Sequence, residues 1–155
     1  MKQYIGTKII EAEPAWRVDG KVFPKSECEV PCGCSVESGY NVRYSDGFES
    51  WVSDEIFREV YRETDGLPFG LAIEAAKMGK CIARAGWNGK GQYVALVTRI
   101  ECKRINGDRP RFIAFHDDIG SRALAFFGTR GVQVGWLASQ SDMLAEDWMI
   151  VQPMI

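Results

Sequence analysis

PFGLAIEAAKMGKCIARAGWNGKG, at residues 68–91, is the stretch of this sequence that decides the fold. Its apolar residues recur at the i, i+3, i+4, i+7 spacing of a helix with one apolar face: Phe69, Ala72, Ile73 and Ala76. A proline precedes them and a glycine follows, which is the usual order at the start and end of a helix. The pattern predicts a helix from Phe69 to about Met78, then a strand at Cys81–Ala85 and a glycine-rich turn.

Short apolar segments beyond this turn predict a sheet that packs on the helix. The expected strands are Gln92–Arg99, Arg111–Phe115, Gly131–Gly135 and Trp148–Gln152. A turn signal at 106–108 joins the first two of them. Residues 116–130 are expected to be a loop with a helical turn, and Ser139–Glu146 is polar enough to contain another. Residues 68–155 should therefore form an α+β domain, an antiparallel β-sheet crossed by one helix.

The first 64 residues predict a separate, small β-rich module. Apolar and β-branched residues favour a strand over Lys2–Ala12, and Pro14 ends this strand or confines it to a sheet edge. Residues 17–39 lack periodicity and predict a long loop. Thr64–Pro68 has the composition of a linker, so the module is expected to span residues 1–64.

A β-hairpin and a helix should complete this module. Tyr40–Tyr44 and Phe48–Trp51 alternate apolar and polar residues around the turn signal Ser45–Gly47. Ser53 suits the N-cap of a helix that extends through Arg62. The apolar residues of that helix are expected to pack on the hairpin: Ile56, Phe57 and Val60.

Composition places the chain among globular proteins. It has 155 residues, of which 46% are hydrophobic and 26% are charged, and this fits one domain with a small appended module. A net charge of −2 argues against a protein that coats long nucleic acid. The apolar runs are too short for a membrane span, and the N-terminus lacks a signal peptide, so we expect a soluble cytosolic protein.

The five cysteines favour reduced thiols, because the count is odd and no signal peptide precedes them. Cys28, Cys32 and Cys34 cluster as C-x3-C-x-C, which suggests a metal site. A zinc site usually adds a second cysteine pair or paired histidines, and neither follows here. Thiols in a loop that contains proline and glycine are therefore the favoured interpretation.

Signatures of catalysis are nearly absent. The single histidine, His116, cannot supply a two-histidine zinc motif, and the sequence has neither a phosphate loop nor a nucleophile elbow. Asp117 and Asp118 beside it could bind a metal or transfer protons, but adjacent residues of a strand point to opposite faces. A solvated loop is favoured there, and we expect a protein without enzymatic activity or cofactor.

The first candidate ligand segment is Ala83–Gly91, whose three glycines let a ligand approach the backbone closely. It offers an aromatic plane, an amide, a central glycine and two cations for phosphate: Trp87, Asn88, Gly89, Arg84 and Lys90. Arg109 and Arg111 are alternative phosphate partners. The competing interpretation is a β-turn in which Trp87 covers the edge of the core.

The second candidate segment is Gly135–Trp148. Its side chains suited to ribose hydroxyls, a base edge or stacking are Trp136, Ser139, Gln140 and Asp142. Trp148 and Met143 are expected to pack inward. The same hydroxyls suit helix capping, with Ser139 or Ser141 as the cap, and capping by one residue leaves the others available for a ligand.

Taken in order, the two segments resemble the type II Thoeris anti-defence family of phage proteins. The first reads K-x-x-x-R-x-G-W-N-G-K-G at residues 80–91, and the second reads W-x-x-S-x-x-D-x-x-A-x-D-W at residues 136–148. The resemblance covers residues 68–152, with Ala138 where family members often have proline. The N-terminal module is similar to a small segment of phage proteins that is found fused to this family.

The resemblance implies a phage sponge that acts in the host cytoplasm. Family members bind a cyclic ADP-ribose isomer, the signal of Thoeris sensors, in pockets between the subunits of a homo-oligomer, here a homodimer or homotetramer. They do not cleave it. Some related sponges also hold cyclic di- or trinucleotides at separate sites. The alternatives are a protein–protein interaction module anchored by exposed tryptophans, which would inhibit a host defence protein, and an enzyme that degrades the signal.

Overall fold

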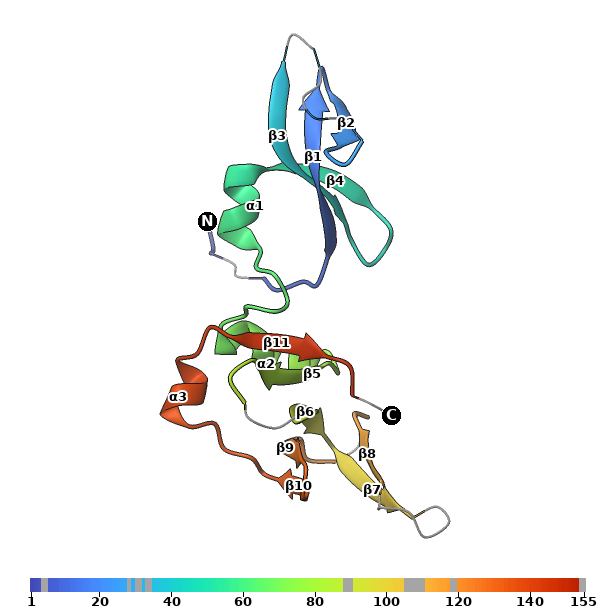
Figure 1. Cartoon of the computed structure of the whole chain (residues 1–155), viewed down its shortest axis with the longest axis vertical. Helices are drawn as coiled ribbons and strands as arrows, with labels where there is room; N and C mark the ends of the chain where they lie inside the picture. Colours follow the sequence, from blue (N-terminus) through green and yellow to red (C-terminus); the bar gives the residue numbers. More distant parts are fainter. Residues whose placement is uncertain are drawn as a thin grey trace. The chain divides into compact units, whose positions relative to one another are not determined.

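The computed structural model describes residues 1–3, 6–27, 29, 32, 35–87, 91–104, 111–117 and 120–153. The chain divides into two compact units, Met1–Arg62 and Glu63–Ile155 (Figure 1). Over the described residues, each unit contains antiparallel sheet. The first unit has one helix and the second has two, which confirms the α+β class. No helix in this part of the chain has both the length and the apolar composition needed to cross a bilayer.

The first unit is a four-stranded antiparallel sheet in the order β2-β1-β3-β4, with one helix after it (Figure 1). Its elements are β1 (Glu11–Val18), β2 (Lys21–Pro24), β3 (Val36–Arg43), β4 (Glu49–Ser53) and α1 (Asp54–Val60). The hairpin expected around Ser45–Gly47 is confirmed, since Arg43 pairs with Glu49 and Gly47 has a φ of 84°.

The sequence misplaced the first strand of this unit. The described residues before Glu11 are not in a strand, and Tyr4 and Ile5 lie outside the described residues. Pro14 does not end the strand, because it lies inside β1, between β2 and β3. Its carbonyl accepts a hydrogen bond from the Lys25 backbone at 2.9 Å, just beyond β2, so the missing prolyl N–H falls where the ladder ends.

The long loop expected at 17–39 is also wrong, because it contains β2 and parts of its neighbours. β1 and β2 form a tight hairpin in which Val18 pairs with Lys21. The two turn residues, Asp19 and Gly20, have φ values of 48° and 85°. Such a turn favours Asp-Gly. The dipeptide Asp19-Gly20 is therefore the sequence signal for this hairpin, and the loop prediction overlooked it.

The helix expected after Ser53 is confirmed, although α1 ends at Val60 and the Ser53 side chain makes no capping hydrogen bond. Phe57 packs on the sheet and stacks on Tyr40 with ring centroids 3.8 Å apart. Ile56 and Val60, also expected to pack there, are 54% and 58% exposed.

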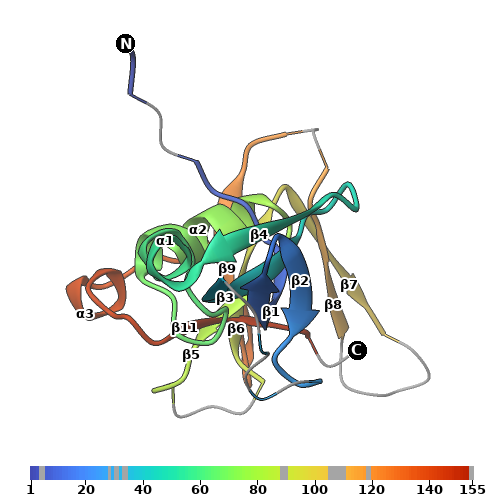
Figure 2. The ribbon, with the colours of Figure 1, turned by 90° about the horizontal axis from the view of Figure 1, so that it is seen from above.

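The second unit contains a five-stranded antiparallel sheet in the order β10-β9-β6-β5-β11 and a two-stranded ribbon, β7-β8. Its elements are α2 (Phe69–Lys77), β5 (Cys81–Arg84), β6 (Tyr93–Val97), β7 (Arg99–Lys103), β8 (Arg111–Phe115), β9 (Ala123–Gly128), β10 (Gly131–Val134), α3 (Gln140–Met143) and β11 (Trp148–Val151). Figures 1 and 2 both show β7 and β8 running side by side.

Helix α2 begins and ends as the sequence predicts. Pro68 stands at its N-cap, and Gly79 follows it with a φ of 80°. The backbone N–H groups of Gly79 and Lys80 donate to the carbonyls of Ala76 and Ala75, which closes the last turn. The helix buries Ala72, Ala75 and Ala76, so small side chains let it approach the sheet closely.

Strand β9 was missed, since residues 116–130 were expected to be a loop. Its two faces are both covered: Ala125 and Phe127 belong to one apolar cluster, while Leu124 and Phe126 pack against another. A strand covered on both sides shows no alternation of polar and apolar residues, so residues 123–128 contain no period-2 pattern that would predict a strand. The turn expected at 106–108 lies outside the described residues.

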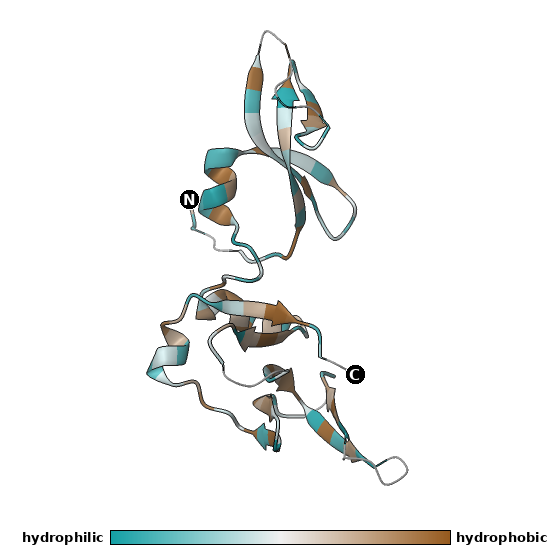
Figure 3. Cartoon of the chain, viewed as in Figure 1, coloured by the Kyte–Doolittle hydropathy of each residue, from teal (hydrophilic) through white to brown (hydrophobic). Residues whose placement is uncertain are grey.

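The sheet of the second unit therefore separates two apolar clusters. On the α2 side, Ile82, Val94 and Trp148 are fully buried. On the other side lie Ala95, Val97, Ala125 and Phe127. Figure 3 shows the same concentration of apolar residues on the central strands. In contrast, strand β7 of the ribbon alternates between polar and apolar residues.

The segment expected to be a linker is attached to the second unit. Leu67 is buried and exchanges backbone hydrogen bonds with Trp148 at 2.7 and 3.1 Å. The Ile150 backbone N–H donates to the Thr64 carbonyl at 2.8 Å. Thr64–Leu67 thus runs along the free edge of β11 and satisfies its backbone groups.

Replacing Gly39→Ala should destabilise the first unit by about 3 kcal/mol. A Cβ there would lie 2.3 Å from the Val52 carbonyl oxygen and 2.7 Å from the Trp51 ring, so β3 and β4 would have to separate. Hydrogen exchange of the β3 and β4 amides in the full chain measures this. Gly6→Ala is the control because a Cβ there meets nothing within 4 Å. Equal protection in the two variants would contradict the packing.

Candidate functional site

Arg84, at the end of β5, connects the two segments that the sequence selected. Its Nε donates to Asp147 Oδ1 at 2.8 Å, and its Nη1 donates to Asp142 Oδ1 at 3.0 Å. Nη1 also lies 3.3 Å from the carbonyl oxygen of Ser141. One guanidinium therefore holds the glycine-rich turn against the α3 segment.

Asp147 fixes the start of that turn from the other side. Its second oxygen, Oδ2, accepts a hydrogen bond from the Gly86 backbone at 3.1 Å. Its carbonyl accepts another from the Ala85 backbone at 3.0 Å. Ala85 and Gly86, just before Trp87, are therefore held by hydrogen bonds to the residue that precedes β11.

Asp142 and Ser139 form a reciprocal cap at the start of α3. The Ser139 backbone donates to Asp142 Oδ2 at 3.0 Å, and the Asp142 backbone donates to Ser139 Oγ at 3.2 Å. Ser139 Oγ is also 2.8 Å from Ser141 Oγ. The capping interpretation of Ser139 is thus confirmed.

These contacts keep all three charged groups ionised. Hydrogen bonds from Arg84 lower the pKa of Asp147 more than burial raises it. Burial raises the pKa of Asp142, but hydrogen bonds from Ser139 and Arg84 outweigh it and the pKa is lowered. The hydrogen bonds to Asp147 and Asp142 raise the pKa of Arg84. Neither carboxylate is suited to accept a proton near neutral pH.

Three tryptophans meet edge to face, and one of them is hydrogen-bonded to the backbone of this ion network. Trp148 is fully buried and donates from Nε1 to the Asp142 carbonyl at 2.9 Å. Its ring centroid lies 5.4 Å from that of Trp87 and 6.2 Å from that of Trp136. Trp87 and Trp136 are themselves 6.2 Å apart at 76°. Trp87 covers the edge of the core, as the competing interpretation held, while both outer rings remain only half-buried.

The structure therefore brings together Arg84, Trp87, Trp136, Ser139 and Asp142. Gln140 lies exposed at the start of α3. Asn88, Gly89, Lys90 and Arg109 lie outside the described residues. Arg111 is on β8, in the ribbon next to the other face of the sheet. Asp147 is the residue whose role was missed, although its place in the second motif was the signal available.

The metal and acid–base alternatives gain no support from the described residues. No three His, Cys, Asp or Glu side chains among them gather as metal ligands do. Cys32 is exposed, whereas Cys28 and Cys34 lie outside the described residues. The Thr98 hydroxyl donates a hydrogen bond to Asp117 Oδ1 at 2.5 Å. Asp118 lies outside the described residues.

Comparison with known proteins points to one family. The family model described as the Thoeris anti-defense 2-like domain matches residues 67–151. The chain is also 33% identical over 89 residues to Thoeris anti-defense 2 of Bacillus phage SP01, and the match covers 55% of this chain and 94% of that protein. The matched region begins at Leu67, ends at Val151 and contains both tryptophan segments.

Replacing Asp142→Asn should lower the free energy of unfolding by about 1.5 kcal/mol at pH 7, because Arg84 loses a charged partner while the cap can still form. A carboxylate whose pKa is lowered by folding stabilises above its ordinary value of about 3.9, and this contribution disappears as pH falls through the folded pKa. Urea unfolding from pH 7 to pH 2 should therefore show the variant and the wild type converging at low pH. Asp65→Asn, at an exposed carboxylate, is the control. A gap that stays constant with pH would contradict the ion pair.

Proposed function

Because this chain belongs to the Thoeris anti-defense 2-like family of phage anti-defence proteins, we propose that it sequesters a cyclic ADP-ribose-type immune signal without cleaving it. The proposal combines the family with a site that could hold a nucleotide. The observation that carries it is the pair of half-buried rings, Trp87 and Trp136, that Trp148 supports from within the core.

The supported rings suit stacking by an adenine base. Base–aromatic stacking contributes about 1–3 kcal/mol per base. Because Trp87 and Trp136 are already fixed by edge contacts, binding loses little side-chain entropy on them. The Ser139 hydroxyl is engaged in the cap of α3, whereas Gln140 beside it is exposed. In this proposal Gln140 lies within reach of ribose hydroxyls or a base edge.

Contacts to the pyrophosphate belong to the glycine-rich turn in this proposal. Arg84 carries one positive charge against two carboxylates, so it positions the turn rather than neutralising a ligand. Lys90 and the backbone around Asn88 and Gly89 are assigned the phosphate contacts on sequence grounds alone.

A second copy of the chain should close the pocket, as a homodimer or a homotetramer. Leu137 and Leu144, which flank the α3 turn, are 87% and 78% exposed beside the site. Apolar side chains gathered at a half-open aromatic site are typical of an interface. A shared pocket also buries more of a compact ligand than one face can.

Sequestration is favoured over hydrolysis by the state of the two carboxylates that bond to Arg84. Asp142 and Asp147 are both committed to Arg84 and have lowered pKa values, so neither is poised as a general base. Calorimetry with cyclic ADP-ribose isomers should show binding, and denaturing the complex should return the compound intact. Recovery of ADP-ribose would mean hydrolysis, and absence of heat would favour the protein–protein interaction module.

Trp87→Ala should weaken binding of the signal more than about tenfold, since it removes a stacking plane and loosens Trp136. Trp16→Ala, the same change in the first unit, is the control and should bind normally. Because Trp87 also packs on Phe126, Trp87→Phe tests the loss of the indole with less damage to the core. Normal affinity in both Trp87 variants would exclude this pocket, and a monomer by light scattering at micromolar concentration would contradict its closure by a second copy.

A further inference from the structure

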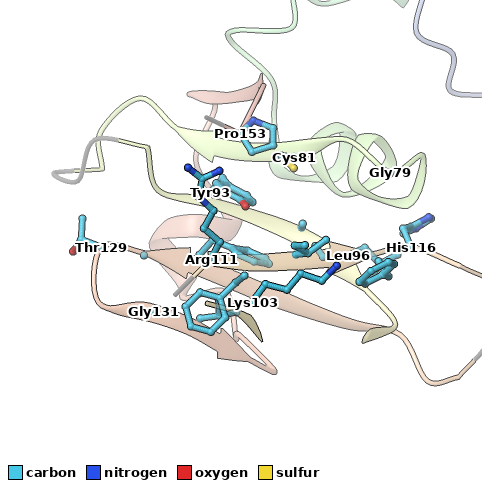
Figure 4. Close-up of a pocket in the computed structure, with 18 of the residues that line it drawn as sticks. Gly79, Cys81, Tyr93, Leu96, Lys103, Arg111, His116, Thr129, Gly131 and Pro153 are labelled. Carbon is cyan, nitrogen blue, oxygen red and sulfur yellow. The ribbon is translucent and has the colours of Figure 1, made fainter. Parts of the chain in front are cut away.

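A groove lies on the face of the second unit's sheet that α2 does not cover (Figure 4). It is bounded by β5, β6, β9 and β10 on one side and by the β7-β8 ribbon on the other, and its volume is about 1180 Å³. Cys81 and Tyr93 come from the sheet, while Lys103 and Arg111 come from the ribbon.

The floor of the groove is largely apolar. Tyr93 and Phe127 stack on each other with ring centroids 4.6 Å apart and planes within 6°. Ala95 beside them is too small to fill the space above the sheet. Burial raises the pKa of Tyr93 and of the Cys81 thiol, as expected where water has limited access. On the ribbon side, Phe112 and Ile113 are each 37% exposed, so apolar surface faces the groove from both sides.

The groove is strongly asymmetric in charge. Among the residues that the structure describes, its lining includes the cations Lys103, Arg111 and Arg130, together with His116, and no carboxylate, in a chain whose net charge is −2. Lys103 lies 4.0 Å from Glu101. Within the part of the chain that the structure describes, neither Arg111 nor Arg130 forms an ion pair with a carboxylate.

We propose that this groove is a second binding site, which takes an organic anion with a flat aromatic body. The rings of the ligand pack between Tyr93 of the sheet and Phe112 of the ribbon, and its anionic group meets the guanidinium of Arg111 at the ribbon. Apolar walls with a few placed cations are the composition of small-molecule sites, and guanidinium groups bind carboxylates, sulfonates and phosphates through paired N–H donors.

This site is independent of the tryptophan pocket. Trp87 and Trp136 pack against the cluster on the α2 side of the sheet, whereas Tyr93 and Phe127 belong to the cluster on the opposite side. The two sites can therefore be tested separately, and the groove does not depend on the signal assigned to the tryptophans.

Anilinonaphthalene sulfonate is the probe, and its uncharged parent, phenylnaphthylamine, reports on the apolar contribution alone. Fluorescence titration should show one saturable sulfonate site per chain. Arg111→Gln should weaken binding of the sulfonate about fivefold and leave that of the uncharged parent unchanged, because the exposed guanidinium contributes about 1 kcal/mol to the anion only. Arg122→Gln removes an exposed arginine of the same unit that does not line the groove, so it should change neither affinity.

Cysteine alkylation gives a second measurement that locates the probe. Saturating sulfonate should slow the reaction of Cys81, which lines the groove, with iodoacetamide. It should not slow that of Cys102, which is exposed on β7 and does not line the groove. Mass spectrometry of the digested full chain distinguishes the two thiols.

Three results would overturn the proposal. The first is equal affinity for the charged and uncharged probes, which would leave no role for the cations. The second is equal weakening by Arg111→Gln and Arg122→Gln, which would indicate nonspecific charge attraction. The third is loss of sulfonate binding in Trp87→Ala with no protection of Cys81, which would place the probe at the tryptophans. A failure to bind cyclic ADP-ribose isomers affects none of these results.

Discussion

Burial of Trp148 is the constraint on which the second unit depends. Its ring contacts Phe69 of α2, Trp87 and Trp136, its backbone pairs with Leu67, and its indole N–H is satisfied by the Asp142 carbonyl. Removing a buried aromatic ring of this size typically costs about 3–5 kcal/mol. These partners come from three stretches of the chain, at 67–69, at 87 and at 136–142. One residue therefore links the start of the domain and its helix to both proposed ligand segments.

The ion network around Arg84 explains how a polar site coexists with that core. Arg84 and Asp142 have side chains only 20% and 14% exposed, and each is stable there because its charge is paired and hydrogen-bonded. Residue type alone suggested a phosphate-binding arginine and a ribose-binding aspartate. In the structure Arg84 and Asp142 bond to each other and hold the turn and α3 together. In the proposed function, the ligand contacts therefore fall to the aromatic rings and to the exposed residues around them.

The sheet of the second unit gives the molecule two chemically different faces. The α2 side contains the tryptophans and the ion network, with carboxylates that balance the arginine. The opposite side presents stacked rings and a groove whose described lining contains cations and no carboxylate. Side chains alternate across every strand, so residues adjacent in sequence, such as Phe126 and Phe127, contribute to different faces.

The sequence by itself determined the elements whose signals are local. The apolar stripe and flanking proline and glycine determined α2, the Ser45–Gly47 turn determined the β3-β4 hairpin, and the two tryptophan motifs identified the family. Only the tertiary structure decided the rest. It placed Pro14 inside β1, and it showed β9, which lacks a sequence pattern because both its faces are buried. It also paired Arg84 with carboxylates 58 and 63 positions away and formed the groove from strands distant in sequence. Pairings of this kind depend on which surfaces meet after the chain folds, and no window of sequence contains both partners.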